Sequence, residues 1–374
     1  MNKPFSVLVT GAKGFVGKHT CLWLKRRGYE VFEYDLGSSE GELSEYVSKA
    51  DFIIHLAGIN RPLKPEEFYD GNVNFTKRLL DEIREKGRKT PLIFSSSIQA
   101  ALDNDYGKSK KQAEDFLFAS GLPVYVYRLA NVYGKWCRAN YNSAAATFCF
   151  NIAHGLPIQI RDREYVVHYN FVEDIVFEFL KVLDSYEEGK PIEPKKEVLY
   201  VNPTDDCSLG RLADLLYAFK EAIESEKHLP VIKGEFELKL FKTFCDYLSD
   251  EGYTYNYAKD DRGYFEEIYK SAKWGQISIN MAYPGIVKGG HYHTYKKEIF
   301  YPVIGSTIIR QRNIKTNEML ADEVDESNSR PVDIIPEYTH EIANVGDKES
   351  LTVMWISKIY DPNTHDTYRM EVEP

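Results

Sequence analysis

The first 180 residues alternate short apolar runs with longer stretches in which apolar residues recur three or four positions apart. The short runs predict β-strands, and the longer stretches predict amphipathic α-helices. The expected strands are Val7–Val9, Val31–Tyr34, Phe52–His55, Leu92–Phe94 and Val124–Tyr127. The clearest expected helices are Phe15–Lys25, Asn74–Lys86 and Ser109–Ala119. Strands and helices that alternate in this way predict right-handed crossovers and a parallel, doubly wound α/β sheet.

The texture of the sequence changes twice further along the chain. From about Pro194 to Asp250 the pattern is irregular, with Leu209–Glu224 as an expected amphipathic helix. After Tyr253, short strand-like runs alternate with turns rich in Gly, Pro and Asp, which predicts a small all-β barrel or sandwich. These runs are Gln276–Met281, Glu298–Val303, Thr307–Gln311, Val332–Ile335 and Leu351–Ile356. We therefore expect two domains, residues 1–250 and 251–374, because 374 residues are too many for one ordinary core.

Composition places the chain among globular proteins, with 43% hydrophobic and 28% charged residues. The net charge of −10 argues against a nucleic acid or an anionic membrane as a partner of the whole surface. The five cysteines are scattered and form no C-x-x-C pair, which is typical of a reduced protein. No run approaches the ~20 apolar residues of a membrane span, and no secretion signal precedes the first strand. We therefore expect a cytoplasmic protein without a membrane partner.

A glycine-rich turn follows the first expected strand. Gly11, Gly14 and Gly17 stand three apart, between an apolar strand and the start of a helix. Small residues let the backbone approach a pyrophosphate, and the helix N-terminus offers free N–H groups and positive potential. The alternative is a tight turn that binds nothing, but the position after a strand favours a dinucleotide site. The residues expected to contact the cofactor here are Gly11, Lys13, Gly14, Phe15, Val16 and Gly17.

Asp35 ends the second expected strand. A carboxylate at this position accepts hydrogen bonds from a ribose 2′-hydroxyl and repels a 2′-phosphate, which favours NAD over NADP. Lys13 and Arg61 argue the other way, because either cation can pair with such a phosphate. An ordinary turn residue at the end of a strand is the alternative interpretation of Asp35. The residues by themselves leave the choice of cofactor open.

Tyr106 and Lys110 stand four apart at the start of a helical pattern and therefore share one face. Reduction of a ketone needs a proton donor at the carbonyl oxygen. A tyrosine with a reference pKa of ~10 serves better when a cation lowers that pKa. Lys110 would supply this field and bind the nicotinamide ribose, and Ser97, at the end of a strand, would hydrogen-bond the same carbonyl oxygen. Tyr–Lys pairs of this spacing also occur by chance on surface helices.

In this order, the glycine turn, the serine-rich strand end and the Tyr–Lys pair resemble the extended short-chain dehydrogenase/reductase family over about the first 240 residues. His55–Gly58 resembles the family's loop beside the adenosine and ribose, and Arg128–Gly134 and Asn170–Asp174 resemble its later cofactor- and substrate-side segments. The resemblance implies a Rossmann fold and a catalytic triad of Ser97, Tyr106 and Lys110. The further implied contacts are Asp35, Leu56, Ala57, Gly58, Tyr106 and Lys110 for the cofactor, and Arg128 and Asn131 for the substrate.

A second chemically distinctive set lies in the expected β domain. His291 and His293 are two apart, so on a strand they point the same way, and Glu298 follows shortly after. His340 can supply a third imidazole, and three His with one Glu suit Zn²⁺, Fe²⁺ or Mn²⁺. Surface histidine pairs are frequent, so the alternatives are a structural role or a metal-free site in which a histidine acts as base.

The spacing of this set from Gly285 to Gly305 resembles the first cupin motif at every fixed position. The second motif is kept only in part, since His340 and Asn344 fit it but Glu337 stands where a glycine is usual. This departure bears on the local turn rather than on the ligand. The resemblance implies a cupin barrel that binds Zn²⁺, or another divalent metal, through His291, His293, Glu298 and His340.

The fusion of such a reductase to a cupin resembles the bifunctional UDP-4-keto-sugar epimerase/reductases on the route to UDP-N-acetyl-L-fucosamine for capsule or O-antigen. The segments that carry this resemblance are Gly11–Lys18, His55–Pro62, Ser95–Ala100, Gly134–Cys137, Tyr141–Ser143, Asp260–Gly263 and Asp361–Asn363. It implies C3 epimerisation of UDP-2-acetamido-2,6-dideoxy-hexos-4-ulose in the cupin, then reduction of the C4 ketone to UDP-2-acetamido-2,6-dideoxy-L-talose in the Rossmann domain. It also implies NADPH, with NADH as the alternative that Asp35 favours, and Arg262 as a candidate ligand of the diphosphate.

Other interpretations stay open on the sequence alone. The cupin can be a non-catalytic dimerisation or sugar-sensing module beside a working reductase, or an Fe²⁺ oxygenase. The whole chain can also be a dinucleotide sensor without activity, although the Ser97, Tyr106 and Lys110 set argues against this. Apolar barrel strands can pair across a two-fold axis, so we expect a homodimer. The expected small-molecule partner is a UDP-linked 4-keto-6-deoxy amino sugar.

Overall fold

The computed structural model describes residues 4–224, 228–248, 257–271, 273–359 and 366–373. Its internal contacts divide the chain into two compact units. The α/β unit comprises Met1–Leu216 with Gly234–Leu248, and the β unit comprises Tyr217–Lys233 with Ser249–Pro374. The domain boundary expected after residue 250, and the segment Asp361–Asn363, lie outside the described residues. Among the helices that are described, none has the length and apolar character to cross a membrane.

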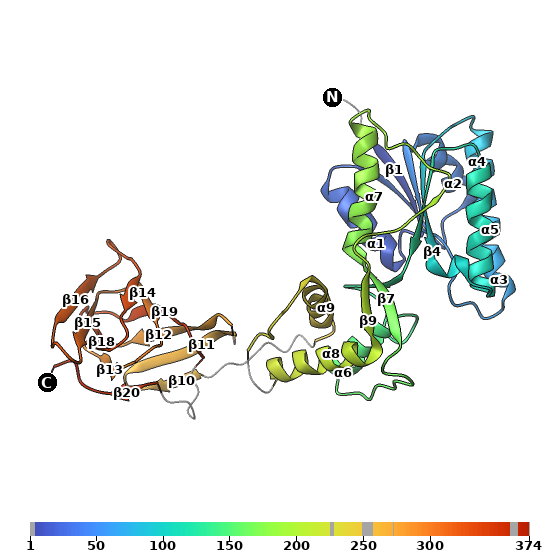
Figure 1. Ribbon diagram of the computed structural model, residues 1–374. Coiled ribbons are helices and arrows are strands. Elements are labelled where there is room, and N and C mark those ends of the chain that lie inside the picture. Colours follow the sequence, from blue (N-terminus) through green and yellow to red (C-terminus); the bar gives the residue numbers. More distant parts are fainter. Residues whose placement is uncertain (1–3, 225–227, 249–256, 272, 360–365, 374) are drawn as a thin grey trace. The chain divides into compact units, whose positions relative to one another are not determined.

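The α/β unit is built on a six-stranded parallel sheet (Figure 1). Its strands follow the order β2-β1-β3-β4-β5-β8, so the direction in which strands are added reverses between β1 and β3. In open α/β sheets, ligands bind outside the carboxyl ends of the strands at such a switch point. All five expected strands are confirmed. The bounds are β1 Ser6–Thr10, β2 Glu30–Tyr34, β3 Phe52–His55, β4 Leu92–Ser97, β5 Val124–Leu129 and β8 Val198–Leu199.

Helices cover both faces of this sheet, because its strands are apolar on both sides. Val7 and Val9 of β1 pack with one pair of helices, whereas Leu8 between them packs on the other face. Figure 1 shows α1 and α7 on one side and α4 and α5 on the other. The first pair is α1 Phe15–Arg26 and α7 Val172–Glu187, and the second face carries α2 Glu40–Lys49, α4 Phe75–Glu85 and α5 Asp105–Ala119. The predicted doubly wound α/β fold is therefore confirmed.

The rest of the α/β unit forms a smaller layer around a three-stranded sheet, β6-β7-β9. The rings of Tyr133 and Phe236 lie 6.0 Å apart in its core, and that of Tyr169 lies 5.7 Å from Tyr133. The helix expected at Leu209–Glu224 is present as α8 with these bounds, and the boundary between the two units, after Leu216, falls within it. The remaining elements are α3 Glu66–Phe68, the π-helix η1 Tyr69–Asn74, the 3₁₀-helix η2 Ile98–Ala101, β6 Asn131–Tyr133, α6 Ala144–Ala153, β7 Val166–Phe171, β9 Asp205–Ser208 and α9 Glu235–Cys245.

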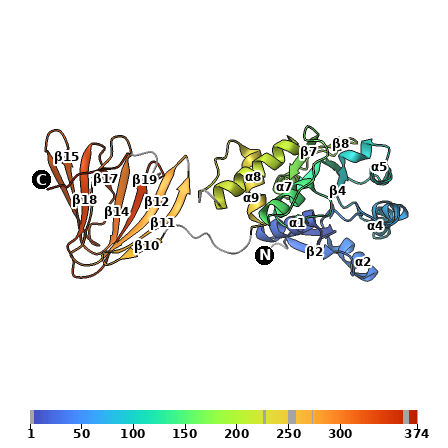
Figure 2. The ribbon, with the colours of Figure 1, turned by 90° about the horizontal axis from the view of Figure 1, so that it is seen from below.

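The β unit consists of two antiparallel sheets, with strand orders β10-β11-β12-β19-β14-β17 and β16-β15-β18-β13-β20 (Figure 2). Apolar side chains from both sheets form one core between them. These are Phe300, Ile309, Val324, Val332, Ile334 and Ile342. The expected all-β architecture and its five expected strands are confirmed. The bounds are β10 Tyr257–Asp260, β11 Gly263–Ser271, β12 Gly275–Ala282, β13 Val287–Tyr292, β14 Glu298–Ile304, β15 Thr307–Asn313, β16 Met319–Val324, β17 Val332–Ile334, β18 Tyr338–Asn344, β19 Ser350–Ile356 and β20 Tyr368–Arg369.

Glu337, at the position where the cupin motif usually has glycine, keeps the backbone conformation of a glycine. Its φ is +63°, in the left-handed region. Its N–H donates to the carbonyl oxygen of His293 at 2.6 Å, and this bond joins the turn to the first motif. The side chain pairs with Lys315 at 2.8 Å, but both side chains are largely exposed, so the pair adds little stability. The unusual residue therefore leaves the turn intact at a conformational cost.

Replacing Glu337 with Gly should raise the free energy of unfolding by about 1 kcal/mol, because glycine adopts positive φ without the Cβ penalty. Urea unfolding of the full chain would measure it. Asn317, with a φ of +59°, is the matched control. Asn317→Gly should gain less, since asparagine tolerates this region. A loss of stability in Glu337→Gly would show that the side chain contributes more than its backbone strain costs.

Candidate functional site

The glycine turn forms a backbone cradle at the sheet's switch point. Gly11 has a φ of +72°, and a Cβ there would lie 2.7 Å from the backbone nitrogen of Ala57, in the turn after β3. A Cβ on Gly17 would lie 2.0 Å from the carbonyl oxygen of Gly11, so only glycine lets α1 start this close to the turn. Gly14 is the N-cap of α1 and provides no side-chain cap, so the helix dipole is left for a ligand. This cradle fits the pyrophosphate of a dinucleotide.

The carboxylate of Asp35 is hydrogen-bonded to the backbone of the glycine turn. Its Oδ2 accepts a hydrogen bond from the backbone N–H of Lys13 at 2.6 Å, and its Oδ1 accepts from Leu36 at 2.7 Å. The carboxylate therefore lies beside the cradle, as a residue that recognises an adenosine ribose must. Two backbone donors already compensate part of its charge, which weakens its repulsion of a phosphate.

The turn after β3 passes directly over Lys110. A Cβ on Gly58 would lie 2.6 Å from Asn72 Oδ1 and 3.0 Å from Lys110 Nζ, so a larger residue would displace the Asn72 amide or the Lys110 ammonium. Asn72 holds the turn in place by accepting from Ile59 N at 2.9 Å and donating to Ile59 O at 3.0 Å. Leu56, Ala57 and Gly58 thus lie between the glycine turn and the predicted catalytic lysine. The glycine turn, the turn after β3, Asn72 and Lys110 thus belong to four separate segments of the chain.

The structure brings Ser97, Tyr106 and Lys110 together. Ser97 is the last residue of β4, and Tyr106 and Lys110 lie in the first turns of α5. Asn104 caps α5 by accepting from Gly107 N at 2.7 Å. A Cβ on Gly107 would lie 2.1 Å from the carbonyl oxygen of Gln99, so this glycine lets α5 start against η2. Close packing of the helix start therefore sets the position of the phenol.

Burial sets the pKa values of this group. Burial raises the pKa of Tyr106, and a hydrogen bond with Ser97 offsets part of the rise. Burial lowers the pKa of Lys110 to about 8, against the opposing field of Glu114. The expected lowering of the Tyr106 pKa by Lys110 is therefore not the net effect in this structure. The Lys110 ammonium donates to Ser95 O at 3.0 Å and lies 4.9 Å from the centre of the Phe94 ring.

Glu114 and Arg128 form a buried ion pair near Lys110. Arg128 donates from Nε at 2.9 Å and from a terminal nitrogen at 2.7 Å, and Ser96 donates to the same carboxylate at 2.5 Å. The predicted role of Arg128 in substrate binding therefore competes with a bidentate structural bond. Asn131, the other predicted substrate ligand of this unit, is exposed and donates to His168 O at 3.2 Å. Both substrate contacts remain predictions.

Two arginines flank an aromatic ring in loops at the carboxyl edge of the sheets. The guanidinium carbon of Arg61, after β3, lies 5.8 Å from the ring centre of Tyr141, and that of Arg138, after β6, lies 5.1 Å from it. Within the described part of the chain, neither guanidinium has a carboxylate within 4 Å. The sequence indicated Arg61 as a phosphate ligand but gave Arg138 and Tyr141 no role. Their separation of about 80 positions hides the pairing.

The predicted metal ligands converge in the β unit. One donor atom from each of His291, His293, Glu298 and His340 lies within 4.8 Å of the others. His291 and His340 are paired directly across β13 and β18, next to a β-bulge at Gly289–His291. Glu298 Oε2 lies 3.0 Å from His340 Nε2 and 3.4 Å from His293 Nε2. Bulges of this kind often aim side chains at functional sites.

The donor set fits a divalent metal. The facing atoms His293 Nε2, His340 Nε2 and Glu298 Oε2 are buried and form no well-aligned hydrogen bond. Burial, followed by the neighbouring His340, lowers the pKa of His291 to about 4. Burial opposes ionisation of Glu298, but the imidazoles of His293 and His340 that face its carboxylate lower its pKa. A neutral imidazole and an ionised carboxylate are the forms that bind metals.

Asp366 orients the cluster from the far end of the sequence. His293 Nδ1 is hydrogen-bonded to the carbonyl oxygen of Asp366. The buried carboxylate of Asp366 accepts from the backbone N–H groups of Thr294 at 2.8 Å and Lys296 at 2.9 Å. Partners of this type fix the tautomer and angle of a metal-binding histidine. Sequence analysis missed Asp366, because no motif links it to residues 70 positions away.

The cluster opens into a cavity of about 440 Å³ in the β unit. This volume is in the range of small-molecule sites. Arg262 lines the cavity together with the four ligands, although its guanidinium pairs with Asp260 at 2.6 Å. Lys288 lines it as well and donates to Asn280 Oδ1 at 3.0 Å. The predicted metal ligands and the predicted diphosphate ligand thus share one cavity.

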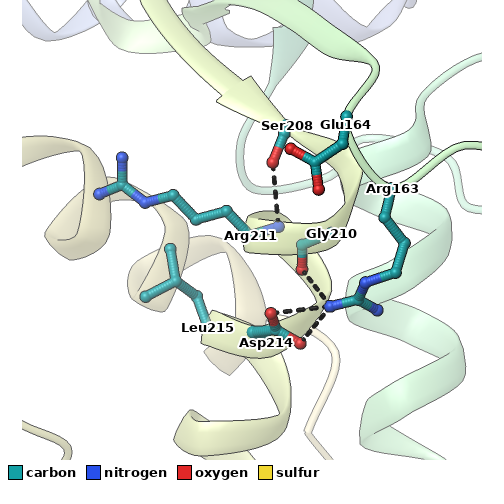
Figure 3. Close-up of a pocket in the computed structure, with 7 residues that line it drawn as sticks. All are labelled: Arg163, Glu164, Ser208, Gly210, Arg211, Asp214 and Leu215. Atoms are coloured by element: carbon teal, nitrogen blue, oxygen red, sulfur yellow. Dashed lines mark hydrogen bonds and ion pairs between the residues drawn. The ribbon is translucent and has the colours of Figure 1, made fainter.

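A second hollow, of about 300 Å³, lies on the α/β unit (Figure 3). Arg163 there points at Asp214, and two hydrogen bonds of 2.7 and 2.8 Å neutralise it. The Arg211 side chain points away from this pair, and the backbone N–H of Arg211 donates to Ser208 Oγ at 3.2 Å. None of the predicted site residues lines this hollow. The Arg163 guanidinium in it is already compensated by Asp214. This hollow is not the candidate site.

Comparisons with known proteins agree with this architecture. Residues 7–195 match the NAD dependent epimerase/dehydratase family, and residues 258–368 match the polysaccharide biosynthesis C-terminal domain. The UDP-2-acetamido-2,6-beta-L-arabino-hexul-4-ose reductase of Pseudomonas aeruginosa is 40% identical over 373 residues, 98% of each chain. The capsular polysaccharide assembling protein CapF from Staphylococcus aureus is 39% identical with a TM-score of 0.86, over 98% of this chain and 100% of that one.

More distant structures share the fold of the α/β unit alone. The UDP-glucuronic acid 4-epimerase of Bacillus cereus, solved with NAD, has a TM-score of 0.55 at 17% identity, over 65% of this chain and 96% of that one. The chain belongs to the NAD dependent epimerase/dehydratase family. Within it, the chain belongs with the CapF-like proteins that carry the polysaccharide biosynthesis C-terminal domain.

Replacing Lys110 with Met should stabilise the cofactor-free protein at pH 7 by about 1–3 kcal/mol, because the variant no longer buries a charge. The folded pKa of Lys110 lies below its unfolded value, so wild type bears this cost below about pH 8 and loses it as the pH rises toward the unfolded value. The gain should therefore shrink between pH 7 and pH 10 in denaturant unfolding. Lys108→Met, an exposed lysine of α5, is the control that should show no such trend. An equal gain at both pH values would contradict the assigned burial.

Proposed function

We propose that the chain is an NAD(P)H-dependent reductase of a UDP-linked 4-keto sugar and that its β unit is a metal-dependent C3 epimerase for the same substrate. The main support for the reductase activity is that Ser97, Tyr106 and Lys110 lie together beside the glycine cradle. The printed name of the Pseudomonas relative supports the substrate, since it is a reductase of a UDP-2-acetamido-hexul-4-ose. The proposed division of labour follows residues 1–250 and 251–374.

In the reductase, each residue has one task. Gly11, Gly14 and Gly17 leave room for the pyrophosphate at the start of α1. A bound reduced nicotinamide supplies the hydride. Tyr106 donates the proton to the ketone oxygen, and Ser97 positions that oxygen by a hydrogen bond. Lys110, buried beneath Gly58, holds the nicotinamide ribose and favours the phenolate left after proton transfer.

We propose NADPH as the preferred cofactor. The resemblance to NADPH-using epimerase/reductases supports it, and Lys13 offers a cation at the edge of the cradle. Asp35 is the residue that opposes it, and its bonds to the N–H groups of Lys13 and Leu36 reduce this opposition. NADH is the alternative, and parallel assays with both cofactors distinguish them.

In the epimerase, we propose that His291, His293, Glu298 and His340 hold a divalent metal, Zn²⁺ by resemblance. Such an ion supplies Lewis-acid polarisation of a carbonyl oxygen, which makes the neighbouring C–H more acidic. The chain's own part is to hold the C4 oxygen at this cluster and to exchange the C3 proton inside the cavity. Arg262, at the cavity wall, is proposed as a ligand of the diphosphate.

Paired variants test this division. Tyr106→Phe should abolish reduction, because no proton donor remains at C4, while solvent deuterium still enters C3. His291→Ala should lose the metal and the exchange, yet still reduce a ketone whose C3 is already inverted. NMR would follow deuterium at C3, and nicotinamide absorbance would follow reduction. If Tyr106→Phe stopped the exchange, or His291→Ala stopped reduction of the inverted ketone, the two activities would not be separate.

Arg61, Arg138 and Tyr141 are proposed to bind the diphosphate and uracil of the substrate in the reductase. Arg138→Ala should raise the KM for the UDP-sugar by about tenfold with little change in kcat, since a charge-assisted bond is lost from binding. The Kd of NADPH, measured by fluorescence, should not change in Arg61→Ala. Arg163→Ala, the arginine paired with Asp214, is the control. Weaker NADPH binding in Arg61→Ala would assign that residue to the cofactor's 2′-phosphate instead.

A further inference from the structure

The floor of the β-unit cavity is a regular row of side chains across three neighbouring strands. Gln276 of β12 is paired with Ile356 of β19, and Ile356 is paired with Glu298 of β14. All three side chains line the cavity. With strands about 4.8 Å apart, Gln276 and Glu298 start about 10 Å from each other, on either side of Ile356. A polar group thus stands at each end of an apolar floor.

The next row continues the polar end on β12 and the apolar middle on β19. Ser278 is paired with Met354, and Met354 with Phe300. Glu267 of β11 is paired with Ser278 and extends the polar side, while Phe300 extends the apolar side. The cavity therefore has a metal-ligand end, an apolar middle and a second polar end on β12. This order is suited to a sugar, whose ring carbons can lie on the apolar middle while its substituents meet the two ends.

The second polar end has an acceptor without a donor. The Gln276 side chain is 4% exposed. Its Nε2 donates to Ser278 Oγ at 2.9 Å, and its Oε1 has no partner. An unpaired buried acceptor costs about 1–3 kcal/mol, and this one lines the cavity, so a ligand bound there can supply the missing donor. A ligand with an N–H or O–H donor at this point would satisfy the acceptor.

We infer that Gln276 Oε1 accepts a hydrogen bond from the N–H of the C2 acetamido group when the C4 oxygen of the sugar lies at the His291, His293, Glu298 and His340 cluster. In a pyranose, C2 and C4 flank C3, just as Gln276 and Glu298 flank Ile356. The reacting C3 then lies over the apolar floor, between two anchored neighbours. This assignment rests on the proposed epimerase and gives its substrate an orientation and a required substituent at C2.

A double-mutant cycle between protein and substrate tests this contact. The full chain, without nicotinamide, is incubated in D₂O with UDP-2-acetamido-2,6-dideoxy-hexos-4-ulose or with the 2-deoxy analogue, which lacks the N–H. Deuterium entry at C3 gives kcat/KM for wild type and for Gln276→Met, which keeps the length of the side chain but removes the acceptor. Metal content is measured in parallel. Wild type should lose about tenfold or more with the analogue, and Gln276→Met should lose as much with the acetamido substrate.

The decisive measurement is Gln276→Met assayed with the 2-deoxy analogue. Gln276→Met should treat both substrates alike and keep its metal, because the two changes remove the same bond. Losses that multiply, or a variant that still prefers the acetamido sugar, would overturn the inference and leave the epimerase standing. No exchange by wild type with either sugar would overturn the epimerase and the inference together. Gln311→Met is the matched control, since this buried amide bonds Asp333 and Ile335 and should lose stability without losing the preference.

Discussion

The buried ammonium of Lys110 is the constraint on which the α/β unit depends. Its charge lies under the turn at Gly58 and is compensated by the carbonyl oxygen of Ser95, the ring of Phe94 and the nearby Glu114. Burial lowers its pKa to about 8, so the folded chain bears part of the cost of the charge until a ligand arrives. The turn at Gly58 and the start of α5 place this charge one helical turn from Tyr106.

Both units keep buried polar groups that their own folds do not satisfy. In the β unit these include the facing nitrogens of His293 and His340, Glu298 Oε2 and the amide oxygen of Gln276, besides Thr352 Oγ1. Apolar packing in their place would make a more stable barrel, as the cluster around Phe300 does between the same sheets. The pattern is that of a protein whose stability is reduced at the points where ligands are expected to complete it.

Much of the fold followed from local patterns. The five parallel strands, α8 and the barrel strands have the apolar periods that define them, and the glycine, Tyr–Lys and histidine motifs lie on short stretches with fixed spacing. The groups that sequence reasoning missed depend on long-range packing. The carbonyl oxygen of Asp366 is hydrogen-bonded to His293, 73 positions earlier. Arg61 and Arg138 both lie near the ring of Tyr141. Gln276 and Glu298 share one row of the sheet, which only the strand register defines. The pKa of Tyr106 was also missed, because burial outweighs a charge that spacing alone suggests.

The most direct test of the account is the fate of two hydrogens in one turnover. Wild-type protein, its metal and NADPH would act in D₂O on UDP-2-acetamido-2,6-dideoxy-hexos-4-ulose, with the product analysed by NMR. We expect UDP-2-acetamido-2,6-dideoxy-L-talose with one solvent deuterium at C3 and protium from the cofactor at C4. A reduced product that keeps protium and its original configuration at C3, or no consumption of NADPH or NADH, would contradict it.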